Sequence, residues 1–135
     1  MRSRLSAHER YTKGDCWYLA LILHRLYGYK LCTFSIYHQM RGETVYYHAF
    51  VLLDEVDGKR RYLDIDGISD FDQIRGRYIP PKVPSCLRGV ITEHEISDFT
   101  RWKTPLLRLR FPDNHLYVYR VARRLVKKFV EGMEK

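Results

Sequence analysis

The stretch TVYYHAFVLLDEVDGKRRYLDIDG, residues 44–67, decides the fold that we predict for this chain. Branched and aromatic residues fill both of its halves, and the pair Asp57-Gly58 between them is a strong signal for a tight hairpin turn. We therefore predict one strand from Thr44 to Asp54 and an antiparallel partner from Arg60 to Asp66. The first strand is apolar on both faces around its middle, a pattern that is typical of a central, buried strand.

The length of the hairpin loop decides which side chains share a face of the predicted sheet. A two-residue loop pairs Val56 with Lys59, and in that register both Asp64 and Asp66 point away from His48. A three-residue loop, or a bulge, shifts the register by one residue and brings both aspartates onto the face of His48. A site that joins His48 to either aspartate therefore requires such a loop or bulge.

Upstream of the hairpin, the segment GDCWYLA at residues 14–20 predicts the start of a helix with Asp15 as its N-cap. The helix is expected to run to about Tyr27 and to end at Gly28, since glycine commonly caps the C-terminus of a helix. Its apolar face consists of residues at helical spacing, namely Leu19, Ile22, Leu23 and Leu26.

The rest of the chain predicts shorter elements and a long helix near the C-terminus. Ser69 or Asp70 would cap a short helix through Arg75, and the prolines between Tyr78 and Pro84 enforce a loop or extended chain. The segment Cys86–Phe99 has no clear pattern. The remaining predictions are a strand at Leu31–Tyr37, a turn at Arg41-Gly42, an interrupted strand at Lys103–Phe111, and a helix from Leu116 to Met133 capped by Asn114.

The composition of the chain narrows its class. Its 135 residues fit a single domain, and the order of the elements defines an α+β fold. Three cysteines, an odd number, argue against a disulfide framework and favour reduced thiols in the cytoplasm. The sequence shows no signal peptide and no apolar run long enough to cross a bilayer, so no membrane partner is expected. Because CxxC and HxxxH pairs do not occur, we expect no metal site.

The last predicted helix is amphipathic and basic, in a chain whose formal net charge is +8. Such a face can contact nucleic acid or an acidic protein, and it can also be only a solvated surface. The apolar stripe comprises Val118, Val121, Ala122, Leu125, Val126, Phe129, Val130 and Met133. The basic face comprises Arg120, Arg123, Arg124, Lys127 and Lys128.

Cys16 is the candidate nucleophile. It falls in the first turn of the predicted helix, where free N–H groups and the positive end of the helix dipole favour a thiolate and can donate to a developing oxyanion. Trp17 follows directly and would shield one side of the site from water. Cys32 and Cys86 lack this setting, and we interpret both as structural. The alternative is that Cys16 is also a small buried apolar residue, as most free cysteines are.

His48 is the candidate general base, because a histidine inside an apolar strand needs a polar partner when it is buried. Asp64 is the first candidate for the group that orients its ring, with Asp66 in reserve, since residues two apart on a strand share a face. The alternatives are a core histidine with a structural role and aspartates that serve the turn before Gly67. The other histidines are weaker candidates: His24 on the predicted helix, and His8, His38, His94 and His115 in segments that look exposed.

Three short segments in this order, GDCWYLA, YHAFVLL and YLDIDG, resemble the papain-like and transglutaminase-like cysteine hydrolases. GDCWYLA resembles the nucleophile helix of papain-like enzymes, in which Trp commonly follows the Cys. HAFV followed by YLDIDG resembles the transglutaminase-like and small bacterial or phage papain-fold pattern, in which a strand His precedes a strand Asp. The resemblance covers about Gly14 to Gly67, less than half of the chain. The resemblance implies a papain-like core in which Cys16 is the nucleophile, His48 is the base and then the acid, and Asp64 is the orienting group.

The resemblance further implies attack on a protein or peptide amide, by a peptidase, amidase, deamidase or transglutaminase-like enzyme without a cofactor. Papain-like proteases usually place a Gln before the Cys as an oxyanion donor, but this chain has no Gln or Asn before Gln39. Arg10, Tyr11 or a backbone amide would replace it, which fits an enzyme that deamidates, cross-links or cleaves one specific partner. The alternative function is an inactive papain-fold binding module that uses the basic C-terminal helix.

Overall fold

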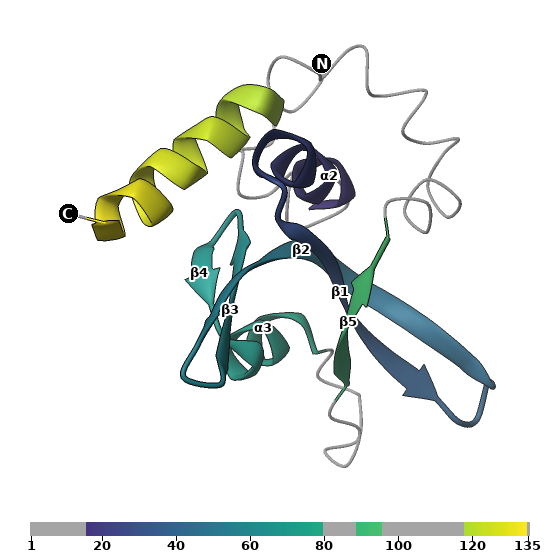
Figure 1. Cartoon of the computed structure of the whole chain (residues 1–135). Coiled ribbons are helices and arrows are strands. Elements are labelled where there is room, and N and C mark those ends of the chain that lie inside the picture. The colour runs from purple at the N-terminus through teal and green to yellow at the C-terminus, as the bar shows by residue number, and fades with distance from the viewer. Residues whose placement is uncertain (1–15, 80–88, 96–117, 135) are drawn as a thin grey trace.

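The computed structural model describes residues 16–79, 89–95 and 118–134, which form an α+β fold (Figure 1). In these residues the helix α2 (Cys16–Tyr27) precedes a five-stranded antiparallel sheet, and a helical segment follows near the C-terminus. The predicted fold class is confirmed at this level. The N-cap Asp15, the cap Asn114 and the predicted strand Lys103–Phe111 lie outside the described residues.

The strand order is β4-β3-β2-β1-β5, which places β2 in the middle of the sheet and confirms the predicted central strand. β5 falls within Cys86–Phe99, where the sequence has no clear pattern. It is a short edge strand with mostly exposed side chains, so it lacks the apolar alternation that marks buried strands. The strands are β1 (Lys30–His38), β2 (Glu43–Val56), β3 (Lys59–Asp64), β4 (Gly67–Ser69) and β5 (Val90–His94).

The hairpin between β2 and β3 begins as a two-residue turn. Val56 pairs with Lys59, and the two turn residues have positive φ, 53° at Asp57 and 76° at Gly58. Two consecutive positive φ values are the geometry of a tight hairpin whose twist matches that of its strands. With this turn alone, the register would direct the aspartates of the second strand away from His48.

A bulge at Leu53 changes the register further along the hairpin. The pairing shifts by one residue between Leu52 and Asp54, and beyond it Val51 pairs with Leu63. Residues with even numbers then share one face in both strands, and Asp64 comes to the face of His48. The condition that the sequence left open is therefore met by a bulge and not by a longer loop.

β3 ends at Asp64, two residues before the predicted end of this strand. Ile65 and Asp66 form a turn, and the chain returns as β4 with Gly67 paired to Asp64. Gly67 has a φ of 95°, a conformation that glycine adopts readily and other residues avoid. The prediction that Asp66 continues the strand beside Asp64 is wrong, because the chain reverses at Asp66-Gly67.

α2 ends as predicted at a left-handed glycine. Gly28 has a φ of 75°, and its N–H donates to the carbonyl of His24 at 2.8 Å, so the last turn is capped. The helix packs on the sheet through a core that also receives the C-terminal helical segment. This core includes Leu19, Ala20, Ile22 and Leu23 from α2, Ala49 and Val51 from β2, Leu63 from β3, and Val121, Ala122 and Leu125.

The opposite face of the sheet is covered by α3 (Phe71–Tyr78), as Figure 1 shows. Asp70 caps this helix in a capping box with Gln73, which confirms one of the two predicted caps. The helix runs three residues beyond the predicted end at Arg75, and it ends where Pro80 disfavours a helical residue at position 79. A second core lies on this face and comprises Cys32, Phe34, Ile36, Phe50, Tyr62 and Ile74.

The C-terminal helical segment is described from residue 118. It is α-helical through residue 125, then forms a π-helical turn, η1 (Val126–Val130), and a 3₁₀ turn, η2 (Glu131–Glu134). Its predicted apolar stripe is buried through Val126 and half-buried at Phe129 and Val130. The long helix is thus confirmed, but its last turns are not regular α-helix. Among the described residues, no helix is both long enough and apolar enough to cross a membrane.

Candidate active site

His48 is a buried histidine in the central strand, with 1% of its surface exposed. Its Nε2 lies 2.7 Å from Oδ2 of Asp64, the residue that the bulge brings to the same face. Since the carboxylate accepts, the ring must carry its proton on Nε2 toward Asp64. The structure therefore joins two of the residues singled out in the sequence by a short, buried hydrogen bond.

Asp64 is held by a second contact with the turn that follows it. Its Oδ1 accepts a hydrogen bond from the backbone N–H of Asp66 at 2.8 Å, while its Oδ2 accepts from His48. The carboxylate is 3% exposed, so both of its oxygens need these donors. The turn at Asp66 thus fixes the rotamer of Asp64 and, through it, the orientation of the imidazole ring.

Within the described residues, the other ring nitrogen of His48 has no hydrogen-bond partner, although Nδ1 is buried. Cys16, the first residue of α2, acts on the same ring, because hydrogen bonding and charge interaction with its thiol contribute to raising the pKa of His48. The imidazole is thus bonded to Asp64 through Nε2 and is electrostatically coupled to Cys16.

The pKa of His48 reflects two opposing effects. Burial disfavours the charged ring and lowers the pKa, but the hydrogen bond to Asp64 and the neighbouring Cys16 raise it more, to about 9. A pKa above neutral favours the protonated ring at neutral pH, with its Nε2–H donated to the carboxylate of Asp64. A buried histidine that stays charged needs a negative partner, and Asp64 supplies it.

Two aromatic rings hold the plane of the imidazole. Tyr78 stacks on it with 3.8 Å between centroids and 11° between planes, and Phe50 packs at 5.4 Å. Burial and the nearby carboxylates of Asp64 and Asp66 raise the pKa of Tyr78, so its hydroxyl stays protonated. Tyr78 was not predicted as a site residue, because no local sequence pattern shows that the end of α3 packs against the central strand.

Asp66 has a different set of partners from Asp64. Its Oδ2 accepts from the Tyr78 hydroxyl at 3.4 Å and lies 3.6 Å from Nε of Arg77, so it faces the last turn of α3. Arg77 also donates to the hydroxyl of Ser69. The carboxylate of Asp66 thus ties α3 to the β3–β4 turn, and the hydrogen bond to His48 belongs to Asp64 rather than to the reserve candidate.

The residues expected to line the site are only partly described. Trp17 is buried beside Cys16 and packs edge-on to Tyr46, with 6.4 Å between ring centroids. Tyr11 lies outside the described residues. Cys16 itself is 5% exposed, so the thiol and the imidazole are both shielded from bulk water in this structure.

The remaining cysteine and histidine side chains of the described residues have other surroundings. Cys32 is buried among apolar side chains, and this burial raises the pKa of its thiol to about 12, as befits a structural residue. His24 contacts the carbonyl of Tyr29 at 2.7 Å. His38 and His94 were expected in exposed segments, but both are half-buried and bonded, to Tyr47 and Thr33 respectively.

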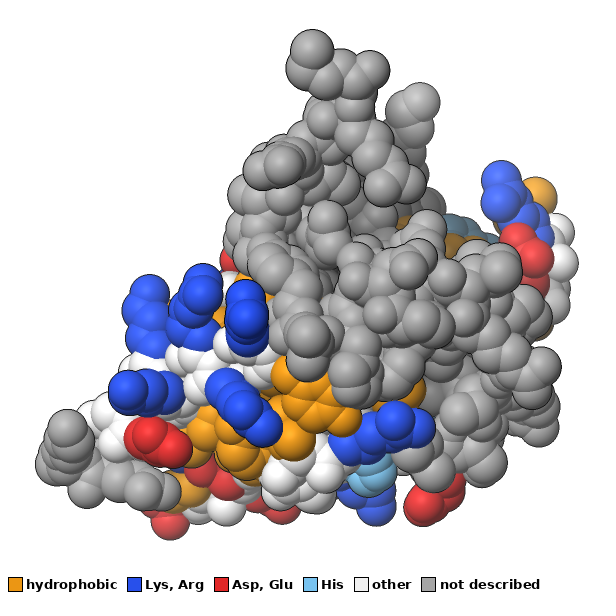
Figure 2. Space-filling view, turned by 90° about the horizontal axis from the view of Figure 1, so that it is seen from above, with side chains coloured by type: hydrophobic (Ala, Val, Ile, Leu, Met, Phe, Trp, Pro, Cys, Tyr) orange, Lys and Arg blue, Asp and Glu red, His pale blue; other side chains and the backbone are white. Residues whose placement is uncertain are grey.

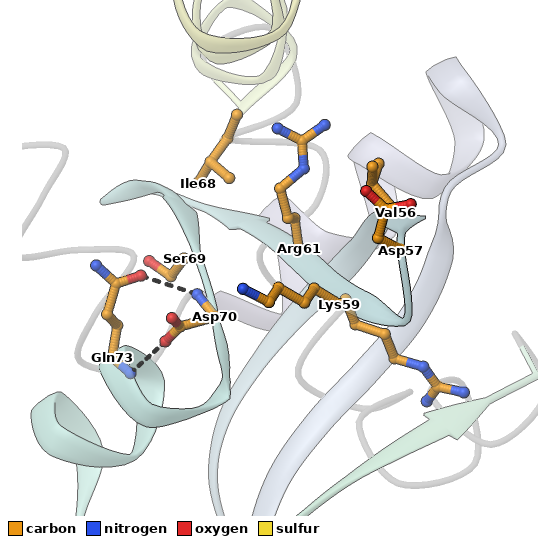
Figure 3. Close-up of a pocket in the computed structure, with 9 residues that line it drawn as sticks. Val56, Asp57, Lys59, Arg61, Ile68, Ser69, Asp70 and Gln73 are labelled. Atoms are coloured by element: carbon orange, nitrogen blue, oxygen red, sulfur yellow. Dashed lines mark hydrogen bonds between the residues drawn. The ribbon is translucent and has the colours of Figure 1, made fainter.

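Two clefts among the described residues lie away from Cys16 and His48. One has a volume of about 490 Å³ and runs between the β2–β3 turn and the start of α3, where Lys59, Ser69 and Asp70 line it (Figure 3). The other, of about 770 Å³, lies beside it and is lined by Tyr62 and Phe71 among others. Neither cleft is lined by Cys16, His48 or Asp64, so these two clefts do not mark the candidate site.

Among the described residues, no group of three or more His, Cys, Asp or Glu side chains is placed to hold a metal ion. No protein-family model matches this chain, and no curated protein or solved structure matches it either. The candidate active site is therefore defined by the chemistry of Cys16, His48 and Asp64 and by the buried hydrogen bond between the last two.

Proposed function

We propose that this chain is a cysteine-dependent acyl-transfer enzyme with a papain-like core, which acts on a protein or peptide amide. Cys16 is the nucleophile, His48 carries the proton and Asp64 orients His48. The observation that carries the proposal is the buried imidazole that is bonded to Asp64 through Nε2, leaves Nδ1 without a partner among the described residues, and is coupled to the Cys16 thiol. A nucleophile, a base and an orienting group in series is the arrangement that thiol catalysis requires.

The proposed reaction begins from a thiolate and an imidazolium. The sulfur of Cys16 attacks the carbonyl carbon of the amide, and the C–S bond forms as the carbonyl oxygen becomes an oxyanion. The C–N bond then breaks, and Nδ1 of His48 gives its proton to the leaving amine. Water or a second amine next attacks the thioester and gives a proton to His48, and the C–S bond breaks to restore the thiolate and the imidazolium.

A raised histidine pKa supports this starting state. The hydrogen bond to Asp64 and the coupling to Cys16 raise the pKa of His48 to about 9, which favours the protonated ring that this starting state requires. Free thiols are also needed, and both described cysteines, Cys16 and Cys32, are free. We place the enzyme in a reducing compartment such as the cytoplasm, where such a thiol survives.

The first test is the pH dependence of alkylation by iodoacetamide, read by mass spectrometry at Cys16, Cys32 and Cys86. We expect Cys16 to react well below the ordinary thiol pKa of about 8.5, and Cys32 to react last. The His48→Ala variant should lose the early reaction of Cys16 and leave the other two rates unchanged. Equal rates at Cys16 and Cys32 in the native protein would contradict the proposal.

A second measurement does not depend on reagent access to the shielded thiol. An NMR titration of the His48 ring should give a pKa near 9, and both Cys16→Ala and Asp64→Asn should lower it. If Asp64→Asn lowers the pKa while Cys16→Ala leaves it unchanged, thiol and imidazole are not coupled. That result, together with an unreactive Cys16, would favour the alternative of an inactive papain-fold binding module.

A further inference from the structure

The exposed side of the C-terminal helical segment is a continuous basic surface. Figure 2 shows Lys and Arg side chains gathered along this segment, at the left of the view. All five basic residues of the predicted basic face are exposed. The apolar residues between them, such as Val121, Ala122 and Leu125, are buried in the core with α2 and the sheet. We call these five residues the basic helix face: Arg120, Arg123, Arg124, Lys127 and Lys128.

The charges of the basic helix face are not neutralised within the described parts of the protein. Arg120, Arg123, Arg124 and Lys127 have no ion pair there, and Lys128 only approaches the Phe129 ring, 5.0 Å from its centroid. Between residues 118 and 132 the sequence has a single acidic residue, Glu131. Arginines on the hairpin differ, since Arg60 and Arg61 lie beside Glu55 and Asp54.

Like charges on this face also oppose the helix that carries them. Arg120 and Arg124 are four residues apart, as are Arg123 and Lys127, and like charges at this spacing destabilise a helix. The packing of the apolar side compensates for this repulsion, but it does not remove the positive potential at the surface. A partner with regularly spaced negative charge would remove it.

The geometry of the face restricts the class of partner. The apolar side is occupied by the protein core, so this segment cannot insert into a bilayer as an amphipathic surface helix does. The cations extend over nine residues, from Arg120 to Lys128, or about 12 Å along the helix axis, a length that spans three to four phosphates along one strand of a duplex. The basic helix face has no exposed aromatic ring, so no side chain of this face can stack a base on an aromatic surface.

We propose that the basic helix face is a binding surface for the phosphodiester backbone of nucleic acid, independent of base sequence. Three of its five cations are arginines, whose planar guanidinium groups match phosphate oxygens in pairs. Regular spacing favours a regular polyanion over the irregular carboxylates of an acidic protein. The surface stands on its own observations and holds whether or not Cys16 is a catalytic thiol.

The test is fluorescence anisotropy with a labelled, mixed-sequence duplex oligonucleotide of about 20 base pairs, titrated with the full chain at several salt concentrations. Four phosphate contacts on a duplex give a slope of about −3.6 in log K against log salt, so affinity should fall about 150-fold between about 50 and 200 mM salt. The double variant Arg124→Glu/Lys127→Glu should weaken binding at least about tenfold and reduce the slope by about 1.8.

A matched control distinguishes binding by the basic helix face from binding that depends only on the net charge of the protein. Arg41→Glu/Lys59→Glu reverses one arginine and one lysine that are exposed on hairpins, and changes the net charge by the same amount. We expect this control to bind nearly as the native chain does. The neutral variant Arg124→Gln/Lys127→Gln repeats the test without new negative charge, and circular dichroism checks that each variant is folded.

Three results would overturn the proposal. The first is no binding of the oligonucleotide at about 50 mM salt, where phosphate contacts are strongest. The second is an equal loss in the Arg41→Glu/Lys59→Glu control, which would assign binding to overall charge. The third is displacement by polyglutamate at the same charge concentration as effectively as by unlabelled oligonucleotide, which would indicate an acidic protein as the partner.

Discussion

The buried cluster around His48 and the basic helix face arrange charge in opposite ways. In the cluster, Asp64 and His48 are almost fully removed from water and the carboxylate has a donor at each oxygen. On the helix face, the cations are exposed and four of them have no ion pair within the described residues. Charges in the first region thus contribute to folding, whereas charges in the second contribute mainly to what the surface attracts.

The largest effect should come from the removal of the carboxylate in the cluster. Asp64→Ala leaves a charged imidazole buried without its partner, and we expect a loss of about 3–5 kcal/mol in the free energy of unfolding. Urea denaturation measures this loss. Asp54→Ala is the matched control in the same hairpin, since it breaks the half-buried surface pair with Arg61 and should cost about 1 kcal/mol or less. Similar losses of stability in the two variants would contradict the difference that we expect between the buried pair and the surface pair.

The pH dependence of stability should show the same cluster. The pKa of His48 is raised from 6.5 to about 9 on folding, so the stabilisation is fully present below pH 6.5 and is lost as the pH rises through about 9. The expected decrease is about 3 kcal/mol at most. Urea titrations between these pH values measure it. Asp64→Asn should flatten the profile, and an unchanged profile in that variant would assign the dependence to another group.

An intermediate effect is expected where the C-terminal segment touches the turn beside the cluster. A Cβ at Gly67 would lie 2.8 Å from the Phe129 ring, and the φ of 95° adds backbone strain. Gly67→Ala should cost about 1–3 kcal/mol in chemical denaturation. Gly58→Ala is the control, because its φ of 76° is also positive but a Cβ there meets nothing.

The double variant Gly67→Ala/Phe129→Leu sharpens this prediction. Removal of the ring relieves the steric part of the cost and leaves the part that comes from backbone strain. The second change should therefore cost less in the Gly67→Ala background than it does in the native protein. Simple additivity of the two free-energy changes would show that Phe129 does not limit the space at Gly67.

The smallest effect on stability is expected on the basic helix face. Arg124→Gln/Lys127→Gln relieves repulsion between like charges, so the free energy of unfolding should stay the same or rise by a few tenths of a kcal/mol. Thermal and urea denaturation measure this change. The same variant should weaken oligonucleotide binding, so it separates the contribution of these cations to binding from their contribution to stability. A loss above about 1 kcal/mol would mean that these side chains take part in packing.

Sequence reasoning predicted most of the elements, because each carries its own local signal. The tight turn at Asp57-Gly58, the left-handed cap at Gly28 and the capping box at Asp70 depend on backbone rules that few neighbouring residues decide. The alternation of buried and exposed residues after Val118 was equally readable. The exposed edge strand β5 gave no such signal and was left open.

The sequence by itself determined the α+β elements and the candidate site residues, Cys16, His48 and Asp64. Only the tertiary structure decided how they combine, because that depends on distant contacts. The bulge at Leu53 chose the face of Asp64, and the turn after β3 gave the hydrogen bond to Asp64 rather than Asp66. Tyr78 reached the imidazole only because α3 packs back on the central strand, a contact between residues 30 positions apart that no local pattern encodes.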